Sequence, residues 1–149
     1  NIGFVLKDKM NRKTREDIID RYLKLVNLEG YRYYYPSQLS GGMKQRISIL
    51  RAFAYPSKVL IMDEPFKSLD VNSKYTIMKF TLKLKKTEGK TCIIVTHDID
   101  EALTLGDRIV ILTGKPTKVK KIIENIPAFY GDKKDYYKLK KVIEEELMD

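Results

Sequence analysis

The sequence is 149 residues long, enough for one domain with a sizeable core, and its 43% hydrophobic and 33% charged residues describe an ordinary soluble protein. It holds no apolar run long enough to span a bilayer and no secretory signal at its start, so any association with a membrane should depend on a partner. The formal net charge of +9 comes largely from lysines scattered along predicted helices and turns, without a motif typical of DNA or RNA binding, and we expect no dedicated nucleic-acid surface.

The first third of the chain predicts two amphipathic helices joined by a tyrosine-rich connector. Residues 14–28 carry apolar side chains at helical spacing, and the letters T-R-E-D at their start resemble a capping box that begins at Thr14. This helix should stop near Gly30. The second helix should span residues 41–55, with Ser40 as its N-cap. Its inward face is expected to hold Met43, Ile47, Leu50 and Ala54.

From residue 58 onward, short apolar runs alternate with helical patterns. The runs at 58–63 and 91–96 have the character of strands covered on both faces, and a third strand is expected at 108–112. The other predicted elements are helices at 71–87, 98–105 and 132–147 and a partner strand at 119–126. The last helix should turn Leu139, Val142, Ile143 and Leu147 inward. This alternation indicates an α/β fold with a parallel sheet.

Two features bear on the compartment and on the extent of the chain. Cys92 is the only cysteine and lies in an apolar run, which predicts a buried thiol in a reducing compartment such as the cytoplasm. Position 1 is Asn1 rather than an initiator methionine, so we expect a fragment.

Acidic side chains and the only histidine follow the first two predicted strands. Asp63 and Glu64 end the first strand, and His97 follows the second, so they should meet at the rim where parallel sheets bind ligands. Asp63 suits Mg²⁺, which takes oxygen ligands, Glu64 can polarise a water for attack on a phosphoryl group, and His97 can hydrogen-bond the terminal phosphate. Taken singly, an Asp-Glu pair after a strand is most often a helix start or a solvated turn, and a lone histidine is more often a satisfied side chain than a catalytic one.

Four motifs occur in the order LSGGMKQR, VLIMDEP, SLD and VTHD. In this order they resemble the motifs of the ATP-binding-cassette (ABC) ATPases, and four motifs in register argue against a chance match. The resemblance implies that Asp63 holds Mg²⁺ through water, that Glu64 is the general base and that His97 is the switch histidine. The signature residues implied to bind nucleotide in trans are Leu39, Ser40, Gly41, Gly42 and Gln45. The implied D-loop, which communicates across a dimer, consists of Ser68, Leu69 and Asp70.

The two adjacent glycines of the signature suggest close approach to a ligand. Glycine is costly in a helix but lets the main chain come near a bound group. Together with the Ser40 hydroxyl and the positive end of a helix dipole, Gly41 and Gly42 would form an anion site. By the resemblance, the anion is the terminal phosphate of ATP held on the opposite subunit's P-loop.

The resemblance also implies the fold, a partial P-loop NTPase (RecA-like) parallel sheet with the helical subdomain of the ABC family, lacking the Walker A strand and loop. The motif G-x-x-x-x-G-K-[ST] does not occur in the 149 residues, so we expect a C-terminal portion that is inactive alone. In the family the Walker A strand lies between the strands equivalent to 91–96 and 108–112, and its absence should open a slot there. The expected domains are a helical subdomain at 1–57, the C-terminal part of the ATPase core at 58–130 and a C-terminal helix at 131–149.

The implied function is that of an ATP-binding and hydrolysing subunit of an ABC importer, with ATP and Mg²⁺ as cofactors. Its partners would be a second copy of the subunit and a transmembrane permease, at the cytoplasmic face of the membrane. HDIDEAL and GDRIVILTGKPTKV look like the nitrate, sulfonate and taurine importer group, although Lys67-Ser68 stands where those relatives commonly carry Gly-Ala. The alternatives are a non-transport ABC ATPase acting on the ribosome or DNA, and an inactive interaction domain.

Overall fold

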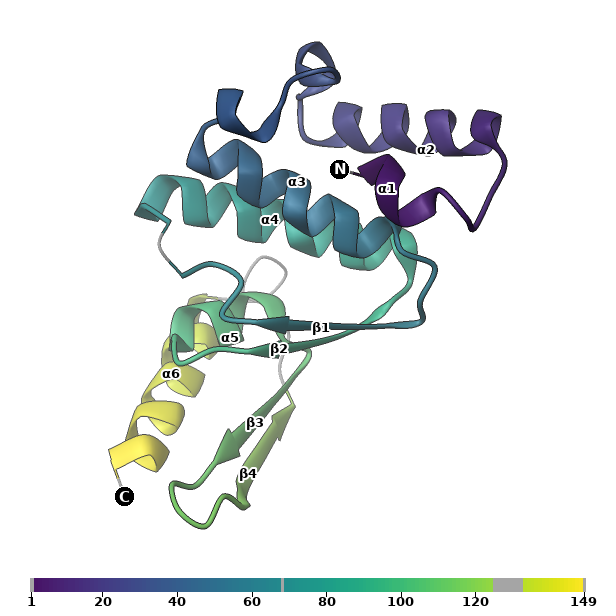
Figure 1. Ribbon diagram of the computed structural model, residues 1–149. Coiled ribbons are helices and arrows are strands. Elements are labelled where there is room, and N and C mark those ends of the chain that lie inside the picture. The colour runs from purple at the N-terminus through teal and green to yellow at the C-terminus, as the bar shows by residue number, and fades with distance from the viewer. Residues whose placement is uncertain (1, 68, 125–132, 149) are drawn as a thin grey trace. The chain divides into compact units, whose positions relative to one another are not determined.

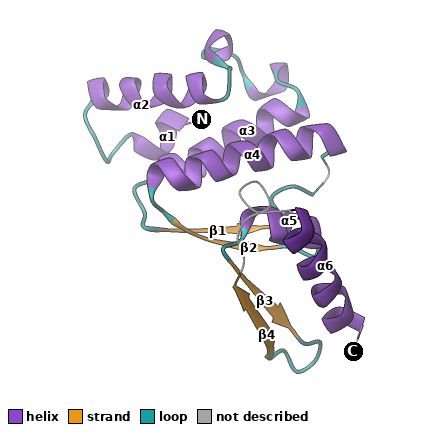
Figure 2. Ribbon diagram, turned by 180° about the vertical axis from the view of Figure 1, so that it is seen from behind, coloured by secondary structure: helices purple, strands orange, loops and turns teal. Residues whose placement is uncertain are grey.

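The chain divides into two compact units, and each is described by itself. The computed structural model describes residues 2–67, 69–124 and 133–148 (Figures 1 and 2). Unit 1 comprises residues 1–60 and 66–93, and unit 2 comprises residues 61–65 and 94–149. No helix in the described ranges is long and apolar enough to cross a membrane.

Unit 1 is mainly helical. Its elements are α1 (Ile2–Leu6), α2 (Arg12–Leu25), the 3-10 turns η1 (Glu29–Tyr31) and η2 (Pro36–Gln38), α3 (Gly41–Ala54) and α4 (Val71–Glu88). Helix α1 packs against α2 and α3, and α3 lies beside α4 (Figures 1 and 2). The core of this unit includes the fully buried side chains of Leu6, Leu50, Phe53, Ile77 and Leu84.

Helix α2 begins and ends earlier than predicted. Its N-cap is Asn11, whose side-chain oxygen accepts a hydrogen bond from the Thr14 backbone N–H at 2.9 Å, so the prediction that the helix begins at Thr14 is wrong. At the other end Asn27 takes a left-handed conformation (φ +56°), and the Leu28 N–H returns to the Leu23 carbonyl at 2.9 Å. Asparagine serves well both as an N-cap and in this helix-ending motif, and it acts here before Gly30.

Helices α3 and α4 confirm the predicted spans to within one residue. Ser40 is the N-cap of α3, as predicted. The most deeply buried side chains of α3 are Ile49, Leu50 and Phe53, so its core face is rotated from the predicted one; Met43, Ile47 and Ala54 are only half-buried. Helix α4 ends at Gly89, whose φ of +60° is the left-handed conformation that glycine adopts without strain.

The strands β1 (Val59–Asp63) and β2 (Thr91–Val95) form one two-stranded sheet. Hydrogen bonds join the two starts, from Thr91 N–H to the Lys58 carbonyl at 3.0 Å, and the two ends, from Glu64 N–H to the Val95 carbonyl at 2.9 Å, so the strands run parallel. Burial alternates along β1, and Ile61 is 68% exposed. The prediction that these strands are covered on both faces is therefore wrong for the described residues, because alternation with period two marks cover on one face.

Unit 2 continues with α5 (Ile99–Leu105), β3 (Arg108–Leu112), β4 (Val119–Glu124) and α6 (Lys133–Met148). Strands β3 and β4 pair antiparallel, as predicted, in a second two-stranded sheet. The predicted single parallel sheet is thus divided, since β3 pairs with β4 rather than with the first sheet. Within residues 2–67, 69–124 and 133–148, β2 does not pair side by side with β3, which would have contradicted the predicted slot. The core of this unit contains Leu103, Ile109, Ile111, Ile123 and Ile143.

Helix α6 packs on the β3–β4 hairpin and on α5. Ile143 is buried, and Leu139 and Val142 pack against the same core, as predicted. The prediction that Leu147 faces inward is wrong, because its side chain is exposed. Lys121 forms an ion pair with Glu146 at 2.6 Å. The expected ends of the partner strand, at 125–126, and of the helix, at 132, lie outside the described residues.

Candidate functional site

Glu64 and His97 meet in unit 2, just beyond the ends of two paired strands. Glu64 follows β1, His97 follows β2, and the Glu64 Oε1 lies 2.6 Å from the His97 Nδ1. The carboxylate is mostly buried, whereas the imidazole side chain is 74% exposed. Glu64 also has a φ of +46°, which is uncommon for a residue with a side chain. Such a conformation costs free energy and tends to occur where function requires it.

The loop that carries His97 is held by a ring of three hydrogen bonds that sequence reasoning did not predict. The Thr96 hydroxyl donates to Glu101 Oε2 at 2.6 Å and accepts from the Asp98 N–H at 3.1 Å. The Asp98 carboxylate in turn accepts from the Glu101 N–H at 3.0 Å, and Asp98 is the N-cap of α5. The spacing D-x-x-E, a capping-box pattern, was the available signal.

Asp63 is the last residue of β1 and is exposed. No ion pair or hydrogen bond of its carboxylate is found among the described residues, and these residues contain no group of three or more histidine, cysteine, aspartate or glutamate side chains that could hold a metal. A single open carboxylate still fits Mg²⁺, which commonly takes one or two protein carboxylates and completes its shell with water and phosphate oxygens.

The signature residues lie in unit 1, at the start of α3. The Ser40 Oγ accepts a hydrogen bond from the Met43 N–H at 3.3 Å, and Gly41 and Gly42 form the first turn. A Cβ at Gly41 would meet nothing within 4 Å, and one at Gly42 would meet only the Ser73 hydroxyl at 3.8 Å. The described part of the chain therefore gives no steric reason for either glycine. The remaining signature residues are Leu39, which is buried, and Gln45, which is half-buried.

The expected D-loop precedes α4, also in unit 1. Asp70 is the N-cap of α4, and its Oδ1 accepts from the Ser73 N–H at 3.0 Å. Hydrogen bonds from the Ser73 side chain and backbone hold the pKa of Asp70 below its ordinary value. The Leu69 N–H donates to the Phe66 carbonyl at 3.4 Å, and Ser68 lies outside the described residues. Asp70 thus has a structural role within the chain whatever it contacts beyond it.

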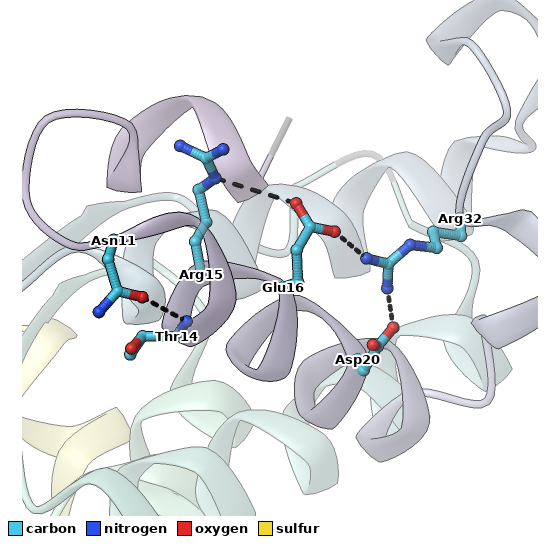
Figure 3. A network of polar contacts seen from close by, with 6 residues as sticks. All are labelled: Asn11, Thr14, Arg15, Glu16, Asp20 and Arg32. Atoms are coloured by element: carbon cyan, nitrogen blue, oxygen red, sulfur yellow. Dashed lines mark hydrogen bonds and ion pairs between the residues drawn. The ribbon is translucent and has the colours of Figure 1, made fainter.

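An exposed aromatic surface lies in unit 1, where the sequence predicted only a connector. In the tyrosine-rich connector, residues 31–36, the Arg32 side chain forms ion pairs with Glu16 and Asp20 of α2 (Figure 3). These ion pairs fix the segment, and its neighbour Tyr33 is 87% exposed. The anchored backbone limits the freedom of the neighbouring rings, so the aromatic side chains stay exposed at a defined place on unit 1. The groove there, of about 490 Å³, is lined by Phe4, Arg32, Tyr33, Tyr34, Tyr35, Pro36 and Arg51.

Comparison with known proteins identifies one family. Residues 4–67 match the family described as ABC transporter. The chain is 41% identical over 125 residues to an uncharacterized ABC transporter ATP-binding protein of Methanocaldococcus jannaschii, covering 83% of this chain and 47% of that protein. It is 42% identical over 120 residues to the aliphatic sulfonates import ATP-binding protein of Bacillus cereus, covering 80% of this chain and 46% of the relative.

A third relative and a solved structure agree. The nitrate import ATP-binding protein of a Synechocystis species is 44% identical over 115 residues, which are 77% of this chain and 17% of that protein. An ABC transporter of the metal-chelate type, solved in an inward-facing conformation, matches with a TM-score of 0.70 at 21% identity, over 83% of this chain and 50% of that one, and so shares the fold. The chain spans about half the length of the first curated relatives that it matches. Over the part that it spans, the chain belongs to the family of ABC transporter ATP-binding proteins.

Proposed function

We propose that the chain is the C-terminal part of the ATP-hydrolysing subunit of an ABC importer. The observation that carries this proposal is the contact between Glu64 and His97, 2.6 Å apart beyond two parallel strands, in a chain of this family. A carboxylate that follows a strand can take the proton of an attacking water, and the exposed imidazole beside it can hydrogen-bond the terminal phosphate and orient that water. Glu64 is thus the proposed general base and His97 the proposed phosphate contact.

Mg²⁺ fits the proposed site through Asp63. Its carboxylate is exposed at the end of β1, one residue before Glu64, which leaves it open to a hydrated cation. When bound, Mg²⁺ would neutralise charge that develops on the phosphate oxygens. Asp63 would hold the ion through water, while Glu64, which already contacts His97, stays free of the metal.

The signature at the start of α3 is the proposed contact for ATP on a second subunit. Backbone N–H groups of the first turn have no partner within a helix and point toward an approaching anion. No described residue gives Gly41 or Gly42 a steric role, which supports an external ligand for this turn. We assign Leu39, Ser40, Gly41, Gly42 and Gln45 to that contact in trans, and Leu69 and Asp70 to the D-loop beside it.

The proposed partners are a second ATPase subunit and a membrane permease. The named relatives import aliphatic sulfonates and nitrate, so the proposed substrate class is a small anionic nutrient of that kind. The aromatic groove of unit 1 is the surface that we assign to the permease, because a large exposed aromatic patch with a fixed backbone is typical of protein contacts.

The coding sequence upstream of Asn1 tests the proposal. We expect it to encode G-x-x-x-x-G-K-[ST] and a glutamine loop, with genes for a permease and a binding protein nearby. A stop codon or an initiator codon immediately upstream of Asn1, or neighbours that encode ribosome or DNA-repair proteins, would contradict it. The 149-residue chain alone should show no ATP turnover, and turnover that Glu64→Gln removes would show that the chain is a complete enzyme.

A further inference from the structure

We infer that Glu101 is a positioning residue, which fixes His97 for catalysis through the Thr96 hydroxyl. The inference rests on the proposed function, because it concerns the histidine to which that function assigns the phosphate contact. Glu101 is 3% exposed, and its carboxylate is not one of the groups to which we have assigned chemistry. A buried carboxylate is costly unless it is hydrogen-bonded, so its retention at this place requires a reason.

The hydrogen-bond ring explains how Glu101 acts at a distance from the imidazole. Thr96 and Asp98 flank His97 in sequence, and each is hydrogen-bonded to Glu101. The Thr96 hydroxyl donates to the Glu101 carboxylate at 2.6 Å, and the Asp98 carboxylate accepts from the Glu101 N–H at 3.0 Å. The Asp98 N–H closes the ring on the Thr96 oxygen at 3.1 Å. The backbone of His97 is therefore held from both sides, although its side chain is largely exposed.

This hold decides where the imidazole can reach. An exposed side chain can adopt several rotamers, so the position of its backbone decides which atoms those rotamers can reach. With the His97 backbone held in place, Nδ1 lies 2.6 Å from the Glu64 carboxylate. A neutral imidazole in that contact carries its proton on Nδ1, because the carboxylate only accepts. The positioning role therefore predicts the Nδ1–H tautomer of His97 in the chain without nucleotide. A contact from Nε2 to a phosphate oxygen would require a second proton on the ring, so the tautomer reports the position of the ring before the phosphate is bound.

The test uses the fact that His97 is the only histidine, so one ¹⁵N-labelled ring reports the contact. In the 149-residue chain at about pH 8, we expect the ¹⁵N spectrum to show mainly the Nδ1–H tautomer. Glu64→Ala removes the acceptor and sets the full size of the change. Glu101→Ala and Thr96→Val should each move the ring most of that way toward the Nε2–H form.

A rescue variant and a matched control separate positioning from stability. Glu101→Gln should restore the wild-type spectrum, since its amide oxygen still accepts the Thr96 hydroxyl. Thr104→Val changes another buried threonine of the same helix, one outside the hydrogen-bond ring, and should leave the ring signals unmoved. An unchanged tautomer in Thr96→Val, or an equal change in Thr104→Val, would overturn the inference. If Glu101→Ala does not fold, Thr96→Val and Glu101→Gln decide the matter.

The result is independent of ATP hydrolysis. If the wild-type ring is in the Nδ1–H form and this form depends on Glu101, the positioning role is supported, whatever the upstream sequence encodes. An upstream sequence without a P-loop would count against the proposed function alone. A full set of upstream motifs with a tautomer indifferent to Glu101 would leave the proposed function standing and refute the positioning role.

Discussion

Replacing Gly41 or Gly42 with alanine should make the chain more stable and the ATPase inactive. Neither glycine has a positive φ, and an added methyl group meets open space at Gly41 and only an ordinary contact at 3.8 Å at Gly42. Alanine within a helix is favoured over glycine by about 0.5–1 kcal/mol, because glycine loses more backbone freedom on folding. For a chain of this length, 1 kcal/mol corresponds to a rise in melting temperature of about 2–4 °C.

ATP turnover should fall in the same two alanine variants, although their stability rises. A methyl group on the first turn of α3 would stand between the backbone N–H groups and the proposed phosphate, and a shift of about 1 Å at such a site can lower a rate about 100-fold. Thermal unfolding of the chain measures the first effect, and ATP turnover by the assembled transporter measures the second. Gly30→Ala is the matched control, since a Cβ there also meets nothing within 4 Å and Gly30 lies outside the signature. Destabilisation by Gly41→Ala, or full turnover in that variant, would refute the reasoning.

Three further outcomes follow from local contacts. Ser40→Ala should lower the free energy of unfolding by about 1 kcal/mol through loss of the α3 N-cap, whereas Ser40→Asn should stay close to wild type; urea unfolding compares the two. Glu64→Gln should lower ATP turnover of the complete subunit by about 10²–10⁴-fold while nucleotide binding persists, and equal turnover would exclude Glu64 as the base. Partial burial raises the pKa of Asp100, but hydrogen bonds from Lys140 and Tyr136 outweigh this effect and hold the pKa below its ordinary value. These two hydrogen bonds therefore stabilise α6 above about pH 4, and the stabilisation is lost as the pH falls further. Asp100→Asn should flatten the acid limb of the unfolding curve, and an unchanged limb would show that this contact does not contribute.

Local signals in the sequence predicted much of the fold. Ser40 before two glycines and an apolar stripe is enough to place the start of α3, because a cap needs only the residues of its own turn. The same kind of signal was misassigned in α2, where Asn11 and Asn27, not Thr14 and Gly30, set the ends. Asparagine and threonine both serve as N-caps, and asparagine and glycine both occur at helix ends. The sequence alone does not indicate which of the two residues ends the helix on each side.

Features that depend on distant partners could not be predicted. The apolar run of β1 indicated a strand covered on both faces, yet Ile61 is exposed, because cover is supplied by other elements and is not encoded in the strand itself. Glu101 follows Asp98 and Asp100 in the sequence and has the character of a solvated side chain. Its burial follows only when α5 packs into unit 2, which brings the carboxylate against Thr96.

The two parts of the candidate site differ in what organises them. Glu64 and His97 are placed by the chain's own structure, through paired strand ends and the hydrogen-bond ring around Thr96. Gly41 and Gly42, in contrast, keep a turn open that nothing in the described residues fills or requires. A chain that places the proposed reacting groups through its own contacts, and whose described residues give no steric reason for the two glycines, fits the proposal that this turn binds a ligand held by another subunit. Stabilisation by alanine at the glycines, combined with loss of turnover, is the outcome that only this division of roles explains.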